Sequence, residues 1–183
     1  NASALANVST ADIQALGSDQ VKALTNAQLG ALSTAQITAL GNDVAELSTS
    51  QITALKSNQV GALTTAQLVA MTTAQMAALT TDQLVNVTTA QLSNLKTAQV
   101  AAFTTAQVAS LTTDQVGSLK TAQLAALTTA QIVAIETDDL QAMSTAQLVA
   151  LTTEQMPRLT TAQVVALTSD QVSSLKTAQL ASL

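Results

Sequence analysis

The chain has 183 residues, of which 48% are hydrophobic, and a net charge of −5. It is long enough to bury a substantial apolar core, but it contains no His, Cys, Trp or Tyr. It therefore lacks an imidazole base, a thiolate nucleophile and the nitrogen and sulfur ligands of zinc, copper and haem, and we expect no enzyme, no catalytic residue, no metal site and no cofactor.

The distribution of charge and apolar residues limits the possible partners. The six Lys and Arg residues are spread along the chain, so there is no basic stripe to neutralise phosphates, and nucleic acid is not an expected partner. Uninterrupted runs of Ala, Val, Ile, Leu, Met and Phe never exceed four residues, which predicts no insertion into a membrane. Cell-surface partners, self-association and the rest of a larger parent chain remain as candidates.

An eight-residue repeat, which we call the octad, runs along the whole chain. It reads LTTAQLVA at residues 63–70, and numbering these residues 1 to 8 places an apolar residue at positions 1 and 6 of every octad. Residues 1–7 are already in phase with the repeat. We therefore interpret residues 1–183 as a single octapeptide-repeat solenoid that is a fragment of a longer tract. Octads begin every eight residues from Val8, except that residues 40–46 form a repeat of seven.

Each octad has the pattern of a helix start. Thr64 and Gln67 have the spacing of a capping box, in which the hydroxyl accepts from an amide of the first turn and the Gln side chain accepts from the amide of the capping residue. Leu63 and Leu68 fit the hydrophobic staple around such a cap. Octads with Lys at position 2 lack the hydroxyl there, so a cap at position 3 is an open alternative.

A start signal in every octad limits each helix to about one and a half turns. A single continuous helix is excluded because eight residues at about 100° each overshoot two turns by roughly 80°, which would wind the apolar stripe around the helix. Isolated short helices are not stable in water, so they must stack and share a core. We predict an all-α fold, an elongated solenoid or superhelix of very short capped helices with one helix per octad.

A β-solenoid is the alternative fold. The Thr content and the possibility of stacked Gln and Thr ladders favour strands. In a strand, however, positions 1 and 6 would point to opposite faces, because one is odd and the other even. Most octads also lack the Gly, Asn or Pro that a tight corner needs.

Two acidic groups raise the question of calcium, because oxygen ligands are all that this chain offers. The densest group is the run Glu136–Asp139, where the alternative interpretation is a solvated helix start. Asn42, Asp43 and Glu46 form a sparser group in the seven-residue repeat. We interpret that repeat as a kink or a phase adjustment.

Two further residue types have a structural interpretation. Pro157, at position 7, is expected near a helix end, where its missing amide donor does little harm. The four methionines occupy positions 1 or 6, which predicts that they fill the core; they are Met71, Met76, Met143 and Met156.

The tandem pattern L-[ST]-T-A-Q-[ILV]-x-A covers essentially all 183 residues. It resembles the LTTAQ-type octapeptide-repeat tracts of very large bacterial secreted and surface proteins, which are often labelled as haem-utilisation or adhesion proteins. The resemblance implies a secreted or cell-surface location and a repetitive, stalk-like segment. Haem binding does not carry over, because the chain has no His, Tyr or Cys and its methionines occupy core positions.

We therefore expect a structural spacer or stalk segment without catalysis. The alternative is a binding module for ice, polysaccharide or protein. Such a module would use a groove of the solenoid or a regular row of threonines, for example Thr73, Thr81 and Thr89, and a flat β-solenoid would favour the threonine row.

Overall fold

The computed structural model describes residues 2–183. All regular secondary structure in this range is helical, and no strand occurs between residues 2 and 183. The all-α prediction is confirmed. The β-solenoid alternative is wrong, because the Thr-Gln spacing forms helix caps where that alternative requires strand ladders.

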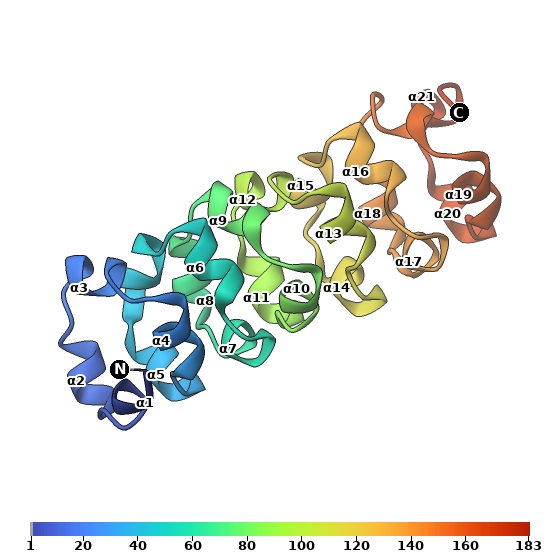
Figure 1. Ribbon diagram of the computed structural model, residues 1–183. Coiled ribbons are helices and arrows are strands. Elements are labelled where there is room, and N and C mark those ends of the chain that lie inside the picture. Colours follow the sequence, from blue (N-terminus) through green and yellow to red (C-terminus); the bar gives the residue numbers. More distant parts are fainter. Residues whose placement is uncertain (1) are drawn as a thin grey trace. The chain divides into compact units, whose positions relative to one another are not determined.

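The chain divides into two compact units, Asn1–Leu95 and Lys96–Leu183, which we call the N-terminal and C-terminal units. Each is a succession of very short helices (Figure 1). The N-terminal unit contains α1 (Ala2–Leu5), α2 (Thr10–Gln14), α3 (Ser18–Lys22), α4 (Asn26–Ala31), α5 (Thr34–Ala39), the 3-10 helix η1 (Gly41–Glu46), α6 (Thr49–Ala54), α7 (Ser57–Gly61), α8 (Thr65–Ala70), α9 (Thr73–Ala78), α10 (Thr81–Val85) and α11 (Thr89–Asn94).

The C-terminal unit continues the same pattern of one helix per octad. It contains α12 (Thr97–Ala101), α13 (Thr105–Ala109), α14 (Thr113–Ser118), α15 (Thr121–Ala125), α16 (Thr129–Val133), α17 (Thr137–Ala142), α18 (Thr145–Val149), the 3-10 helix η2 (Met156–Arg158), α19 (Thr161–Ala166), α20 (Ser169–Ser174) and α21 (Thr177–Leu180). That the two units form one continuous solenoid stays a prediction.

The helix cap lies at position 2 of the octad. At the start of α8 the hydroxyl of Thr64 accepts from the amide of Gln67 at 3.2 Å, and the amide of Thr64 donates to Oε1 of Gln67 at 2.9 Å. Position 3, Thr65, is the first helical residue. The chain returns to extended backbone at Met71, which is position 1 of the next octad. The sequence left two places for the cap, and the structure selects the capping box with Gln as its third helical residue.

Positions 1 and 6 form the core of each unit. Leu63 at position 1 is 1% exposed, and Leu68 at position 6 is fully buried. Burial of these side chains against neighbouring helices supplies the stability that a helix of one and a half turns lacks by itself. The four methionines are buried at the same positions, which confirms their predicted role as core residues.

Within each unit a helix packs on the helix three octads further along the chain. In the N-terminal unit α2 packs on α5 and α7 on α10, and in the C-terminal unit α14 packs on α17 (Figure 1). Hydrogen bonds between stacked turns join residues 24 to 31 positions apart, as in the bonds from Thr38 to the carbonyl of Ala62 and from Gln83 to the carbonyl of Ile52. One turn of the stack therefore takes between three and four octads.

The seven-residue repeat fits this stack as a 3-10 helix. With one residue fewer, η1 is wound more tightly than its neighbours, and Gly41 adopts a φ of 57°, which favours glycine. Val44 is fully buried and takes the place of a position-6 residue. The 3-10 helix thus compensates for the missing residue within this one repeat, and Val44 still lies in the core.

Candidate functional site

A buried glutamine at position 5 joins successive turns of each unit. In α10, Oε1 of Gln83 accepts from the amide of Thr80 at 2.8 Å, while its Nε2 donates to the carbonyls of Ile52 at 2.9 Å and Leu55 at 2.6 Å. The side chain is only 2% exposed. One amide group therefore closes the N-terminus of its own helix and donates to carbonyls at the C-terminal end of the helix four octads earlier, where the carbonyl of Ile52 also accepts from the amide of Leu55.

The same glutamine contact recurs through both units, always to carbonyls 26 to 31 residues earlier. Its members are Gln36, Gln51, Gln59, Gln67, Gln75, Gln83 and Gln91 in the N-terminal unit, and Gln131, Gln147, Gln155, Gln163, Gln171 and Gln179 in the C-terminal unit. A buried carbonyl left without a partner costs about 1–3 kcal/mol, so this glutamine ladder is a principal polar interaction between turns.

Reasoning from the sequence assigned these glutamines to capping and missed the contact between turns. The signal lies in the octads where the capping hydroxyl is absent. Lys56 occupies the cap of α7 without a side-chain bond, yet its amide still donates to Oε1 of Gln59 at 2.7 Å, and Nε2 of Gln59 donates to the carbonyl of Leu32 at 2.7 Å. Position 5 remains Gln in these octads although position 2 has no hydroxyl, which indicates that the glutamine has a second role besides the capping box.

The acidic run Glu136–Asp139 lies at the start of α17. Asp139 takes the place of the glutamine, is 4% exposed, and its Oδ1 accepts from the hydroxyl of Thr113 at 2.7 Å. Glu136 is the N-cap and makes no side-chain capping bond. Within residues 2–183 no three acidic, His or Cys side chains gather where they could hold a metal ion, so the structure does not assemble these residues into a calcium site.

The acids of the seven-residue repeat hold η1 against α3. Oδ1 of Asp43 accepts from the hydroxyl of Ser18 at 2.6 Å, and Glu46 forms an ion pair with Lys22 at 2.8 Å. The hydrogen bond and the charge of Glu46 raise the pKa of Lys22. Both partners belong to α3, on which η1 packs, so these side chains attach the irregular repeat to the turn before it.

The predicted threonine row does not form a line along the stack. Thr73, Thr81 and Thr89 are exposed first residues of the consecutive helices α9, α10 and α11. Stacked helices are three octads apart, so these three threonines follow one another around a turn. The position-2 hydroxyls of the same octads accept from backbone amides within their caps. The flat array that ice binding would need is not produced by consecutive octads.

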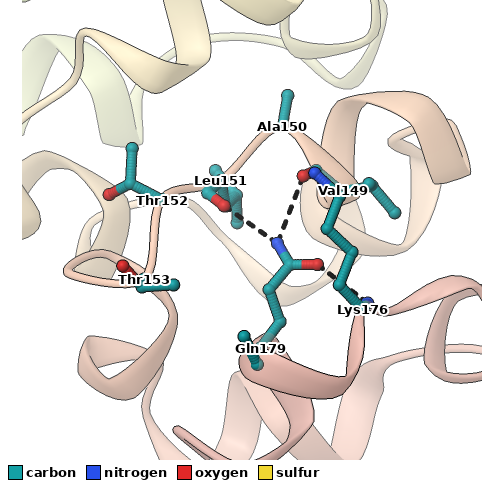
Figure 2. Close-up of a pocket in the computed structure, with 8 residues that line it drawn as sticks. Val149, Ala150, Leu151, Thr152, Thr153, Lys176 and Gln179 are labelled. Carbon is teal, nitrogen blue, oxygen red and sulfur yellow. Dashed lines mark hydrogen bonds between the residues drawn. The ribbon is translucent and has the colours of Figure 1, made fainter.

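Two small pockets occur in the C-terminal unit. The larger, of about 370 Å³, is lined by residues 149–153 together with Lys176, Ala178 and Gln179, and Figure 2 shows the amide of Gln179 bonded to the carbonyls of Val149 and Leu151. The smaller, of about 290 Å³, is lined by Thr129, Ala130, Val133 and Arg158. The larger pocket is built around a member of the glutamine ladder, and neither is lined by a carboxylate.

These features define the class of protein. Within residues 2–183 no helix is long and apolar enough to cross a bilayer. Short helices of similar construction stack turn upon turn, with an apolar core and a repeated polar contact, which is the organisation of an all-α solenoid repeat protein.

The chain belongs to the ALTTAQ repeat family. The sequence profile of that family matches residues 5–42, 60–89, 87–121 and 132–169, which together make up well over half of the chain. The resemblance to LTTAQ-type octapeptide repeats is thereby confirmed. Comparison with curated proteins finds no match.

Proposed function

We propose that this chain is a structural spacer or stalk segment, without catalysis, of a large bacterial repeat protein that is secreted or held at the cell surface. The observation that carries the proposal is the glutamine ladder. Each octad with a glutamine at position 5 can add one more copy of the same contact with the preceding turn, as Gln83 and Gln163 do. In a structure of this kind, stability depends on neighbouring turns and the number of repeats sets the length.

The partner that this role requires is the rest of the parent chain, whose other segments the spacer would hold apart. The low density of charge favours this role over recognition of a charged ligand, since Lys and Arg number six and Asp and Glu eleven. The surface instead repeats small polar side chains at the helix starts, such as Thr73 and Thr81. Neither pocket offers an acid or base for catalysis beyond Lys176 and Arg158.

Deletion of whole octads tests the spacer role. Removal of residues 63–70, and of residues 63–78, is expected to leave a cooperatively melting helical protein, because every remaining glutamine keeps its register with the carbonyls of the preceding turn. The maximum dimension measured by small-angle X-ray scattering should fall in step with the number of octads removed. A maximum dimension that does not change with octad number would contradict the proposal.

A half-octad deletion is the matched control. Removal of residues 63–66 takes out fewer residues but moves every following position out of register with the turn before it. It should lower the melting temperature more than removal of the whole octad. Equal losses from both deletions would show that register between turns does not determine the stack.

The alternative function, binding through a threonine row, has its own test. Replacement of Thr73, Thr81 and Thr89 by Lys would abolish ice binding by such a row, measured as thermal hysteresis, and would leave a spacer unchanged. The position of these threonines around a turn favours the spacer.

A further inference from the structure

Position 7 of an octad meets the last residue of the repeat three places further along the chain. In the N-terminal unit the hydroxyl of Thr38 donates to the carbonyl of Ala62 at 3.1 Å, and Lys22 forms its ion pair with Glu46 at 2.8 Å. Thr38 and Lys22 are position-7 residues, and Ala62 and Glu46 are the last residues of their repeats. A charged residue at the end of one repeat can therefore find its partner at position 7 of the preceding turn.

Arg158 is the last residue of its octad in the C-terminal unit and lies at the corresponding contact. It belongs to η2, which packs on α16, and it lines the pocket of about 290 Å³ together with Thr129, Ala130 and Val133 of α16. Val133 is the position-7 residue three octads earlier. In the other eight-residue octads from Val8 onward, position 8 is Ala, Ser or Asn, so a basic side chain at this contact is particular to Arg158.

The guanidinium of Arg158 has no partner within residues 2–183. It forms neither an ion pair nor a hydrogen bond with another described side chain, and Val133, which corresponds in position to Lys22, is apolar. Glu154, four residues earlier, is exposed and does not line the pocket. The hydroxyl of half-buried Thr129 is likewise not bonded to any residue of the described chain. The pocket therefore combines an unpaired cation and an unbonded hydroxyl with an apolar wall.

These groups together select one chemical class of ligand. A guanidinium presents a planar fork of donors that matches the two oxygens of a carboxylate. Val133 is 42% exposed and Ala130 is exposed, so a short aliphatic group lying on them would remove apolar surface from water. A volume of about 290 Å³ is close to the lower limit of known ligand pockets, about 300 Å³, which restricts the ligand to a small molecule.

We propose that this pocket binds a small aliphatic carboxylate. The carboxylate accepts from the guanidinium of Arg158 and from the hydroxyl of Thr129, and the aliphatic group lies on Val133 and Ala130. The pocket lies within the stack of the C-terminal unit, because α16 packs on α13 as well as on η2 and three further octads follow Arg158. The site is an addition to the spacer role and does not depend on it.

Titration of the isotope-labelled 183-residue chain with 3-methylbutanoate at neutral pH, followed by nuclear magnetic resonance, tests this proposal. The backbone amide signals of residues 129–133 and 156–159 are expected to shift and to saturate. The dissociation constant should lie in about the millimolar range, which is what so small a ligand reaches. Absence of saturable shifts at these residues up to about 50 mM ligand would overturn the proposal.

Two related probes separate the contribution of the charge from that of the aliphatic group. 3-Methylbutanamide has nearly the same shape without the charge, and acetate has the charge without the branched chain. Each should bind at least about tenfold more weakly than 3-methylbutanoate. Acetate binding as tightly as 3-methylbutanoate would show only a general attraction of anions to Arg158. An equal affinity for the amide would show that the guanidinium is not used, and either result would contradict the proposal.

Variants on the two sides of the pocket complete the test. Arg158→Gln removes the cation, and Val133→Asp gives Arg158 an internal carboxylate in the arrangement of Lys22 and Glu46 with the charges reversed. Both should lower the affinity for 3-methylbutanoate at least about tenfold. Val85→Asp is the matched control, because Val85 also occupies position 7 and is 42% exposed but does not line the pocket.

Binding by Val133→Asp or Arg158→Gln at the level of the Val85→Asp control would contradict the proposal, provided that each variant keeps the helical circular dichroism of the parent. Arg158→Gln retains every octad, so its maximum dimension in small-angle X-ray scattering should equal that of the parent chain. Failure of the carboxylate site and failure of the spacer role are therefore distinguishable.

Discussion

Two irregular octads of the C-terminal unit differ in opposite ways. The octad containing Pro157 loses its α-helix, which is replaced by a turn and η2, yet Gln155 keeps its bonds to the amide of Thr152 at 2.8 Å and to the carbonyl of Leu127 at 2.7 Å. The octad containing Asp139 has the regular α-helix α17 but no capping box and no glutamine at position 5. Helix geometry and the contact between turns are therefore separable properties of the octad.

The difference has a simple physical cause in each case. Proline has no amide hydrogen, so Pro157 cannot donate to a carbonyl of the preceding helical turn, but it lies after Gln155 and leaves that side chain in place. Aspartate is shorter than glutamine by one methylene group, and its side chain has no nitrogen that could donate a hydrogen bond. Asp139 accordingly accepts from Thr113 and donates nothing to the turn before it. The glutamine contact is thus kept where the helix is distorted. A regular helix, in contrast, does not supply the contact where the position-5 glutamine is absent.

The largest effect is expected from removing the glutamine of the distorted octad. Gln155→Ala should lower the free energy of unfolding by about 2–3 kcal/mol, because the amide of Thr152 and the buried carbonyl of Leu127 lose their partner and the carbonyl of Leu124 keeps only the amide of Leu127. Urea unfolding followed by circular dichroism measures the change. The neighbouring exposed substitution Glu154→Ala should stay within about 0.5 kcal/mol. Equal effects of the two substitutions would show that the glutamine contact contributes little.

Restoring the glutamine in the acidic octad should have the next largest effect. Asp139→Gln is expected to raise the free energy of unfolding by about 1 kcal/mol, since the amide of Glu136 gains an acceptor and the carbonyls of Val108 and Leu111 gain a donor. The bond from Thr113 is lost in exchange, which limits the gain.

A double-mutant cycle separates these two contributions. Thr113→Val should destabilise the parent chain by about 1 kcal/mol and have a smaller effect in the Asp139→Gln background, where its partner is absent. Equal effects in both backgrounds would mean that the bond between Thr113 and Asp139 does not contribute to stability.

The cap hydroxyl should matter less than the glutamine. Lys120→Thr adds a hydroxyl to the cap of α15, where the amide of Lys120 already donates to Oε1 of Gln123, and should stabilise the chain by about 0.5–1 kcal/mol in thermal unfolding. Removal of a cap hydroxyl in the next octad by Thr128→Ala should lower the free energy of unfolding by about 1 kcal/mol. A loss on adding the hydroxyl would contradict the position-2 cap.

The smallest change in stability is expected from Pro157→Ala. Alanine allows the octad to become α-helical, which should increase the circular dichroism signal at 222 nm. The gained hydrogen bond is offset by the greater freedom of the unfolded chain, so the net change in unfolding free energy should remain below about 1 kcal/mol. A large stabilisation would indicate that the distorted helix strains the contact made by Gln155.

Sequence periodicity was sufficient to predict the local structure. The Thr-Gln spacing and the apolar residues at positions 1 and 6 indicate that each octad starts a helix and which side of it faces the core, because these depend on neighbours within one octad. The choice between a cap at position 2 and one at position 3 came from the structure. Sequence periodicity did not predict that Gln83 meets Ile52. That contact depends on the angle accumulated over three to four octads, and a period of eight residues does not state how many octads complete a turn.

The same limit applies to the irregular octads. The composition of residues 136–139 suggested calcium, whereas the partner of Asp139 is a threonine 26 residues away. The shortened repeat was identifiable by its length, but its conversion to a 3-10 helix depends on keeping Val44 in the core. In both places the acidic side chains have their partners on the preceding turn of the stack, Thr113 for Asp139 and residues of α3 for Asp43 and Glu46.

The direction of the glutamine contact has a consequence for the order of folding. Each amide reaches back toward the N-terminus, over no more than 31 residues, as Gln36 does to Leu5 and Gln171 to Leu140. A growing chain can therefore complete one turn as soon as the next has been synthesised, without waiting for any distant segment. Such short-range closure is typical of proteins that fold rapidly. We expect a nascent chain of this family to fold in the order in which it is made.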